Sequence, residues 1–223
     1  MKVGVLGSGT VGQTIGTKLV GLGHEVYMGS REAANPKAIA WANKENVKKN
    51  DGTNKRALFG TFANAAEFAE IIFNCTLGSA SLDALQQAGA VNLSGKILMD
   101  VSNPLEYGNE GWSLTVCNTD SLGEQIQRAF PQTKVVKTLN TVNCSVMVDP
   151  NRLIQTTDAF MSGNDITAKA MVMKILRDWF GWRSVIDLGD ITTARGVEMY
   201  VLFWHNVRNV VHTPGFNIKV IST

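Results

Sequence analysis

The feature that most constrains the fold of this chain is a glycine motif near its start. Residues 2–6 form a short apolar run typical of a buried strand, and residues 11–22 have the composition of a helix. Between them lies a G-x-G-x-x-G pattern made by Gly7, Ser8, Gly9, Thr10, Val11 and Gly12. In this position the pattern gives a tight turn and lets the backbone approach a pyrophosphate at the helix N-terminus. It therefore predicts a dinucleotide-binding unit in which these residues contact the coenzyme.

The rest of the chain continues the alternation of strands and helices. A strand over residues 25–28 completes a βαβ unit, and apolar runs at 71–75, 96–100 and 134–139 predict further strands. A helix is expected over 82–88, and the polar stretch 43–56 is interpreted as a helix end followed by a loop. In the last third we expect strands at 158–161 and 183–188, a helix that starts after residues 163–165, and an apolar helix over 192–211.

These patterns predict an α/β protein with a Rossmann-type, doubly wound, mostly parallel sheet and a C-terminal extension of helices and strands. A length of 223 residues suits a single domain. We expect a nucleotide-binding core over residues 1–142 and the extension over residues 143–223. The helix over 192–211 is apolar on most of its circumference. This favours a subunit interface, and hence a homodimer, although burial between layers of one subunit would also explain it.

The composition excludes several function classes. Twenty-one Lys and Arg against 19 Asp and Glu give a net charge of +2, which is too small to indicate a nucleic acid or an anionic membrane as partner. Cys75, Cys117 and Cys144 form no CxxC pair, and the three histidines lack metal-ligand spacing, so no metal site is predicted. No signal peptide is recognisable, and no apolar run reaches the ~18 residues of a membrane helix. We expect a cytoplasmic protein whose partner is a small molecule.

The end of the second strand distinguishes between the nicotinamide coenzymes. An NAD-binding unit places Asp or Glu there to hold the ribose hydroxyls, but here Ser30 stands 18 residues past Gly12 and Arg31 follows it. A hydroxyl and a guanidinium suit a ribose 2′-phosphate, and Lys37 lies within a short loop's reach as a second cation. The pattern favours NADP, whereas Glu32 would favour NAD if the loop were shifted by two residues. Flavin adenine dinucleotide and S-adenosylmethionine use similar glycine turns, but their sites usually have a carboxylate at this strand end.

Two further segments follow predicted strands, at the edge where open α/β sheets bind ligands. Asn140 and Thr141 follow the strand at 134–139 and are candidates for orienting the reacting rings. Hydride transfer between stacked rings requires alignment and no acid–base pair, although turn residues bonded to their own backbone would explain both positions as well. The segment after 71–75 is expected to border the same cleft and to contact the dinucleotide. It consists of Thr76, Leu77, Gly78 and Ser79.

Several separated motifs resemble one enzyme family. They are the opening through Gly12, residues 21–26 (GLGHEV), residues 29–31 (GSR), residues 134–142 (KVVKTLNTV), and residues 187–189 with Arg195 and Glu198. Over nearly the whole chain they resemble the coenzyme F420-dependent NADP oxidoreductases. The resemblance implies a Rossmann-type fold, NADP(H) as the coenzyme, and hydride transfer between NADP(H) and a deazaflavin.

One segment departs from the archaeal deazaflavin enzymes. Those enzymes carry His-Thr-Ile-Pro in the turn that faces the nicotinamide, whereas this chain has Asn140, Thr141, Val142 and Asn143. Together with residues 100–103 (DVSN), this turn is more similar to the reductase domain of the STEAP metalloreductases. That resemblance implies an ordinary flavin as the acceptor. Flavin and deazaflavin therefore both stay open as the co-substrate.

Two other functions stay open on the sequence. NADP-dependent dehydrogenases of small hydroxyacids share the first half of the pattern, but they place a lysine on a helix after the nucleotide domain. The helix over 192–211 offers Arg195 and no lysine. A non-catalytic sensor that binds NADP(H) would also need no catalytic pair, and it predicts tight binding without turnover.

Overall fold

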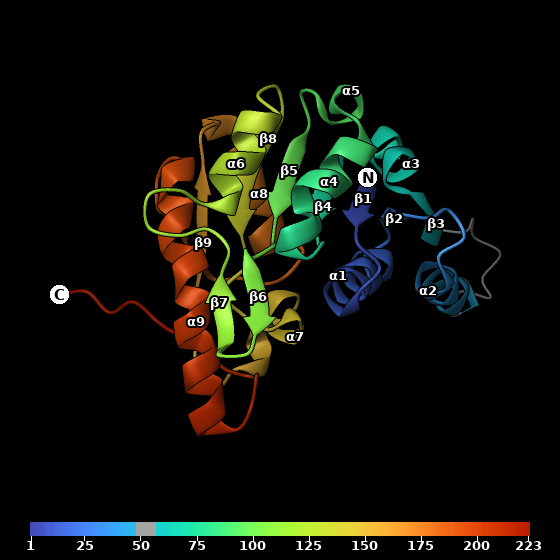
Figure 1. Ribbon diagram of the computed structural model, residues 1–223. Coiled ribbons are helices and arrows are strands. Elements are labelled where there is room, and N and C mark those ends of the chain that lie inside the picture. Colours follow the sequence, from blue (N-terminus) through green and yellow to red (C-terminus); the bar gives the residue numbers. More distant parts are fainter. Residues whose placement is uncertain (48–56) are drawn as a thin grey trace.

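Eight strands form one twisted sheet through the middle of the molecule (Figure 1). The computed structural model describes residues 1–47 and 57–223. The strand order is β10-β9-β8-β5-β4-β1-β2-β3, and every neighbouring pair is parallel except β8 and β9. The predicted doubly wound, mostly parallel sheet is therefore confirmed. Its strands are β1 (Lys2–Leu6), β2 (Glu25–Ser30), β3 (Ala57–Thr61), β4 (Ile71–Asn74), β5 (Ile97–Asp100), β8 (Lys134–Thr138), β9 (Asp158–Gly163) and β10 (Ser184–Asp187).

Helices cover both faces of the sheet. One face carries α1 (Thr10–Gly21), α2 (Pro36–Val47), α7 (Cys144–Met147) and α8 (Ile166–Asp178). The other carries α3 (Phe62–Phe68), α4 (Gly78–Ala88), α5 (Ala90–Leu93) and α6 (Leu122–Ala129). Two short 3-10 turns are η1 (Pro150–Arg152) and η2 (Ile191–Thr193). The long helix α9 (Ala194–Val211) begins in the second layer and continues down the edge of the molecule (Figure 1).

The apolar runs of the sequence become the central strands because both of their faces are covered. In β4, Ile71 and Phe73 belong to the core beneath α1 and α8, whereas Ile72 belongs to the core beneath α3 and α4. Side chains alternate along a strand, so a strand covered on both faces needs apolar residues at successive positions. All three of these side chains are at most 3% exposed.

The strand order opens a crevice at one edge of the sheet. β1 lies between β2 and β4, and the chain leaves β1 towards α1 on one face but leaves β4 towards α4 on the other. At such a switch point the connections diverge and leave space outside the carboxyl ends of the strands. β5 and β8 run parallel to β4, so their carboxyl ends reach the same edge. The glycine motif and the two predicted cleft segments therefore share one side of the molecule.

An antiparallel hairpin that the sequence analysis did not predict stands outside the main sheet. It consists of β6 (Leu105–Gly108) and β7 (Gly111–Leu114), and it lies beside α9 in front of the sheet (Figure 1). Gly111 takes φ +97°, a conformation that glycine adopts easily in a tight turn. The predictions also omitted β3, α3, α5, α6 and α7, and they included only the end of α2. Of the stretch interpreted as a helix end and a loop, residues 43–47 lie in α2, and residues 48–56 lie outside the described residues. Within the described chain, no helix has the length and apolar character needed to cross a membrane.

Candidate functional site

The loop between β1 and α1 has the geometry that its glycine motif predicts. Gly7 takes φ +116°, and a Cβ atom added there would lie 2.6 Å from the carbonyl oxygen of Cys75. A Cβ on Gly12 would lie 1.9 Å from the carbonyl oxygen of Gly7, so both positions require glycine for the turn to form. Gly9 is different, because a Cβ there meets nothing within 4 Å. The protein itself does not need glycine at this exposed position, which leaves room for close approach of a ligand.

Two helices begin at this edge without a side-chain cap. Gly9 is the N-cap of α1 and Leu77 is the N-cap of α4, and neither provides a side-chain hydrogen bond to the helix. Uncapped N–H groups at a helix N-terminus carry partial positive charge and bind anions. β1 and β4 are adjacent parallel strands, so both helix N-termini lie at the same edge of the sheet. The arrangement suits an anionic ligand such as a pyrophosphate.

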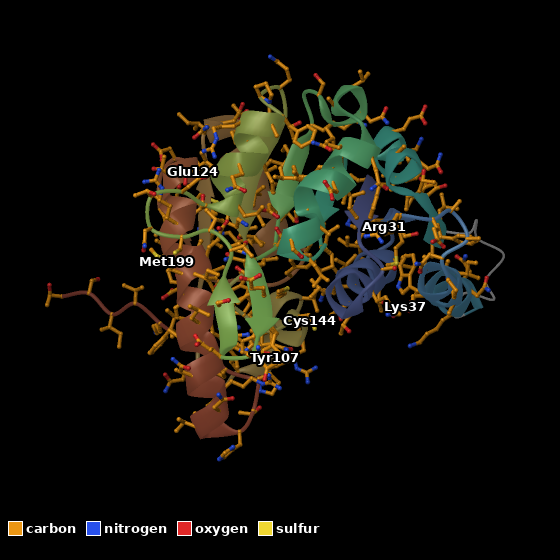
Figure 2. All side chains as sticks on the ribbon, viewed as in Figure 1. Arg31, Lys37, Tyr107, Glu124, Cys144 and Met199 are labelled. Carbon is orange, nitrogen blue, oxygen red and sulfur yellow. The ribbon has the colours of Figure 1, made fainter. Side chains whose placement is uncertain are left out.

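The region between β2 and the start of α2 contains one buried hydroxyl and two exposed cations. Ser30 is 3% exposed, and its hydroxyl donates to the carbonyl oxygen of Glu32 at 2.6 Å. Arg31 and Lys37 are exposed, and their charged groups make no hydrogen bond or ion pair with another described residue. Both lie on the side of the molecule that carries α1 and α2 (Figure 2). Arg31 and Lys37 are therefore available to an anion, whereas the Ser30 hydroxyl already has a partner.

Asn35, which the sequence analysis did not select, connects this region to the glycine loop. Its side-chain oxygen accepts hydrogen bonds from the Ser8 hydroxyl at 3.1 Å and from the backbone N–H groups of Lys37 and Ala38 at 3.1 and 3.2 Å. The signal was present in the sequence, since Asn followed by Pro36 is a typical N-cap with proline at the first helical position. The start of α2 and the glycine loop are thus held in a fixed relative position.

A cleft of about 420 Å³ opens beyond the glycine loop. The structure brings together there most of the predicted cleft residues, namely Thr10, Val11, Thr76, Leu77, Gly78, Asn140 and Thr141. Ser79 is exposed next to this group but does not line the cleft. Cys144, the first residue of α7, also lines it, on the side of α7 next to the hairpin (Figure 2). The opposite wall contains residues that the sequence analysis did not assign to the site. They are Ser102, Asn103, Leu105, Trp112, Val201, Trp204 and His205.

The titratable groups that line this cleft are mostly neutral. Burial, and then the nearby charge of Asp100, raises the pKa of the Cys75 thiol. Burial, together with the charge of Arg208, lowers the pKa of His205. Among the described residues, no Lys, Arg, Asp or Glu lines the cleft. The walls are suited to an uncharged ring system more than to acid–base chemistry on a small carbonyl compound.

Asn140 and Thr141 differ in what their side chains contact. The Asn140 amide donates to Asn103 Oδ1 at 2.9 Å and to the carbonyl oxygen of Val197 at 3.0 Å, while the Asn103 amide donates back to the Asn140 carbonyl at 2.8 Å. Asn140 therefore joins the end of β8 to the loop after β5 and to α9. Thr141 is 4% exposed, and its hydroxyl has no hydrogen-bond partner among the described residues. Leu139, with φ +60°, makes the turn that brings both residues to the cleft.

Lys137, Asp100 and Glu198 form a buried charge cluster that connects the elements lining the cleft. Lys137 is 0% exposed, and its ammonium lies 2.5 Å from Asp100 Oδ2, 2.8 Å from Glu198 Oε1 and 2.8 Å from the Ser102 carbonyl oxygen. Glu198 also accepts hydrogen bonds from two backbone N–H groups at the start of α6. Burial acts to lower the pKa of Lys137, but the two carboxylates outweigh it, so the pKa is raised and the lysine stays charged. The cluster ties β8, the loop after β5, α6 and α9 together.

Comparison with known proteins places the chain in a family. Residues 2–104 match the model of the coenzyme F420-dependent NADP oxidoreductases. A crystal structure from Arthrobacter sp. FB24, of a protein provisionally named an F420-dependent NADP reductase, is 45% identical to this chain. It covers 100% of both chains with a TM-score of 0.91. The chain belongs to the coenzyme F420-dependent NADP oxidoreductase family. The resemblance stated from the motifs is confirmed, and the protein is an NADP-dependent oxidoreductase.

Curated relatives of this oxidoreductase include one F420-dependent NADP reductase and one STEAP metalloreductase, the two groups that its motifs resemble. The F420-dependent NADP reductase of Methanothermobacter marburgensis is 25% identical over 98% of each chain. The metalloreductase STEAP3 of Rattus norvegicus is 31% identical over 88% of this chain, which spans only 36% of that relative. A reductive aminase from Aspergillus terreus, solved with NADPH4, cyclohexanone and allyl amine, shares the fold with a TM-score of 0.63 at 18% identity.

Proposed function

We propose that this oxidoreductase transfers a hydride between NADP(H) and a flavin or deazaflavin acceptor. The observation that carries the proposal is the continuity between the glycine loop and the 420 Å³ cleft, which share Thr10 and Val11. One ligand can therefore extend from the uncapped start of α1 into a space bounded by the carboxyl ends of β4, β5 and β8. NADPH supplies the hydride when it is bound there. The residues of this chain supply binding, alignment and exclusion of water.

The coenzyme is held by the residues predicted from the sequence. The backbone from Gly7 to Gly12 and the segment from Thr76 to Ser79 face the pyrophosphate and the nicotinamide half of the ligand. Arg31 and Lys37 bind the ribose 2′-phosphate, because Arg31 follows β2, Lys37 lies in the first turn of α2, and neither charged group has a partner among the described residues. Ser30 contributes by holding the Arg31 loop through its bond to the Glu32 carbonyl, in place of the direct phosphate contact expected from the sequence.

Thr141 and Asn140 act on the reacting rings in different ways. The hydroxyl of Thr141, which has no partner among the described residues, lines the cleft and is able to orient a ring edge. Asn140 is a positioning residue, because its amide holds α9 and the loop after β5, which form the acceptor side of the cleft. The hydroxyacid dehydrogenase alternative needs a lysine in the cleft. Among the described residues none lines it, and Lys137 is occupied by two carboxylates.

An acceptor screen tests the function. Purified protein is mixed with NADPH and, separately, with coenzyme F420, FMN, FAD and riboflavin, while NADPH consumption is followed in the absence of oxygen. We expect turnover with at least one of these acceptors and none with small 2-oxo acids. Tight NADPH binding without turnover on any acceptor would support the sensor function instead.

The exposed half of α9 supports assembly as a homodimer. Phe203, Val210 and Val211 are 55%, 76% and 46% exposed, an apolar stripe that a monomer would leave in water. Light scattering at tens of micromolar is expected to give a dimer, and Phe203→Asp is expected to shift it towards the monomer. A wild-type protein that remains monomeric under these conditions would contradict the assembly.

A further inference from the structure

Three aromatic side chains on two separate elements form one wall of the cleft. Trp112 comes from β7 of the hairpin, and Trp204 and His205 come from α9. The Trp112 and His205 rings are stacked, with centroids 4.6 Å apart and planes inclined by 20°. The Trp204 ring meets His205 edge-on, at 5.2 Å and 89°. The hairpin and α9 thus meet through ring contacts at the place where the cleft opens.

Two properties of these rings are unusual for a wall that only packs against itself. Trp112 is 46% exposed although it is a large apolar ring. Trp204 is only 9% exposed, yet its indole N–H is buried and has no hydrogen-bond partner in the described part of the chain. Buried polar groups are nearly always paired, and an unpaired one in a site wall indicates a missing partner. Trp112 keeps this exposure although Tyr107 also meets it edge-on, at 5.0 Å and 66°. A partly exposed ring and an unpaired donor are complementary to a flat ligand with an acceptor atom at its edge.

We propose that Trp112, His205 and Trp204 bind the ring of the acceptor, with the stacked pair covering a ring face and the Trp204 N–H donating to a carbonyl oxygen or ring nitrogen. The β6–β7 hairpin is then the element that selects a flat heteroaromatic acceptor over an aliphatic carbonyl compound. This inference rests on the proposed function, because it assumes that the acceptor occupies this cleft.

The electrostatics of the wall agree with a neutral ring partner. Burial and Arg208 lower the pKa of His205, so its imidazole is uncharged near neutral pH. An uncharged imidazole stacks on a ring through dispersion and its own π-system, without placing a cation against it. Lys137 cannot supply a charge to the cleft in its place, because it is fully buried behind the wall and paired.

Four variants test the inference. Trp112→Leu removes the flat ring but keeps an apolar side chain, and Trp112→Phe restores a ring. Trp204→Phe removes the N–H donor and keeps a ring. Phe203→Leu is the matched control, since Phe203 lies on the same helix, is 55% exposed and does not line the cleft. Each protein is titrated with oxidised FMN, riboflavin and F420 without coenzyme, by quenching of ligand fluorescence, and separately with NADPH.

For the acceptor that binds the wild type most tightly, the dissociation constant is expected to rise about threefold to tenfold in Trp112→Leu, as the loss of one aromatic contact predicts. Trp112→Phe should recover most of this loss, and Trp204→Phe should weaken the acceptor severalfold. NADPH affinity should stay within twofold in all of these variants, and Phe203→Leu should match the wild type for both ligands.

The outcome separates the inference from the function. Suppose that the wild type reduces an acceptor, and that Trp112→Leu and Trp204→Phe bind this acceptor as tightly as the wild type does. The proposed function then stands, and the proposal that the aromatic wall binds the acceptor is overturned. If no acceptor supports turnover, the proposed function fails. In that case, loss of flavin or deazaflavin binding in Trp112→Leu would still support the wall, and unchanged binding would overturn it.

Discussion

Removal of the buried lysine is the most demanding prediction for the architecture of the site. Lys137→Met replaces the ammonium with an apolar side chain of similar length and leaves Asp100 and Glu198, which are 0% and 1% exposed, without their cation. Breaking a buried ion pair by removing one partner costs about 3–5 kcal/mol, because a charge is left uncompensated. In this cluster the two carboxylates keep other hydrogen-bond donors, which reduce the loss of stability. Glu198 keeps two backbone N–H donors from α6, and Asp100 keeps Asn74 and Ser102.

The expected loss is therefore about 3 kcal/mol at neutral pH, near the lower end of that range. For a chain of this size it corresponds to a fall in Tm of roughly 6–12 °C. Thermal unfolding followed by circular dichroism measures it. The triple variant Lys137→Met/Asp100→Asn/Glu198→Gln is the control, and it should regain much of the lost stability because no unpaired charge remains.

The pKa of Lys137 sets the pH range in which this residue stabilises the fold. The folded-state pKa of Lys137 is raised above its ordinary value of 10.5, so its contribution is fully present below that value and is lost only as the pH rises through the higher folded pKa. At neutral pH the contribution is therefore complete. A Tm of Lys137→Met within about 2 °C of the wild type at neutral pH would refute the view that this cluster holds the cleft walls together.

Three further predictions concern the coenzyme region and the acid limit of stability. Arg31→Gln should weaken NADPH by about tenfold to a hundredfold and leave NADH within twofold, as measured by fluorescence titration; an equal loss for both coenzymes would contradict the phosphate contact. Gly9→Ala should fold with the Tm of the wild type but bind NADPH at least tenfold more weakly, and normal NADPH binding by this variant would remove Gly9 from the site. Gly12→Ala should instead lower the Tm, because its Cβ would lie 1.9 Å from a backbone oxygen. The hydrogen bond from Arg128 lowers the pKa of Asp120 to about 2 from 3.8, so this carboxylate contributes stability above about pH 4 that is lost as the pH falls to about 2. Arg128→Gln should lack this contribution, so its free energy of unfolding should fall less than that of the wild type between about pH 4 and pH 2. The same pH dependence of stability in both proteins would show that the pair contributes nothing.

The nucleotide-binding half of the fold was predictable because its signals are local. The glycine motif, the apolar runs and the spacing of the second strand each lie within a short segment, and the sheet placed them as expected. β3 and α3 were missed, because residues 57–68 are short and rich in alanine, and the capping box formed by Thr61 and Asn64 is a weak signal. The hairpin was missed for a similar reason, since it is short and outside the sheet, without the strand alternation of a buried element.

The acceptor side of the cleft was not predictable in the same way. About 90 residues of sequence separate Trp112 from the adjacent pair Trp204 and His205, and the rings meet only because α9 returns to the hairpin. In the sequence, His205 is one of three histidines without metal-ligand spacing, and it falls on the predicted apolar helix over 192–211. Lys137 falls within the predicted strand over 134–139, and nothing local indicates that Asp100 and Glu198 enclose it. Long-range pairs of this kind follow from topology, which sequence periodicity does not specify.

The central claim is direct hydride transfer from NADPH to an acceptor ring in this cleft, and isotope transfer tests it most directly. NADPH labelled with deuterium on one face of nicotinamide C4, and separately on the other, is reacted with coenzyme F420 in ordinary water, and the reduced product is analysed by mass spectrometry. Deazaflavin carries carbon where a flavin carries its reactive nitrogen, so a transferred deuterium is retained. We expect one deuterium in the product from only one of the two labelled coenzymes. Trp112→Leu should form this labelled product more slowly at acceptor concentrations below saturation, with the same deuterium content per molecule. A reduced product without deuterium from either coenzyme would contradict direct transfer.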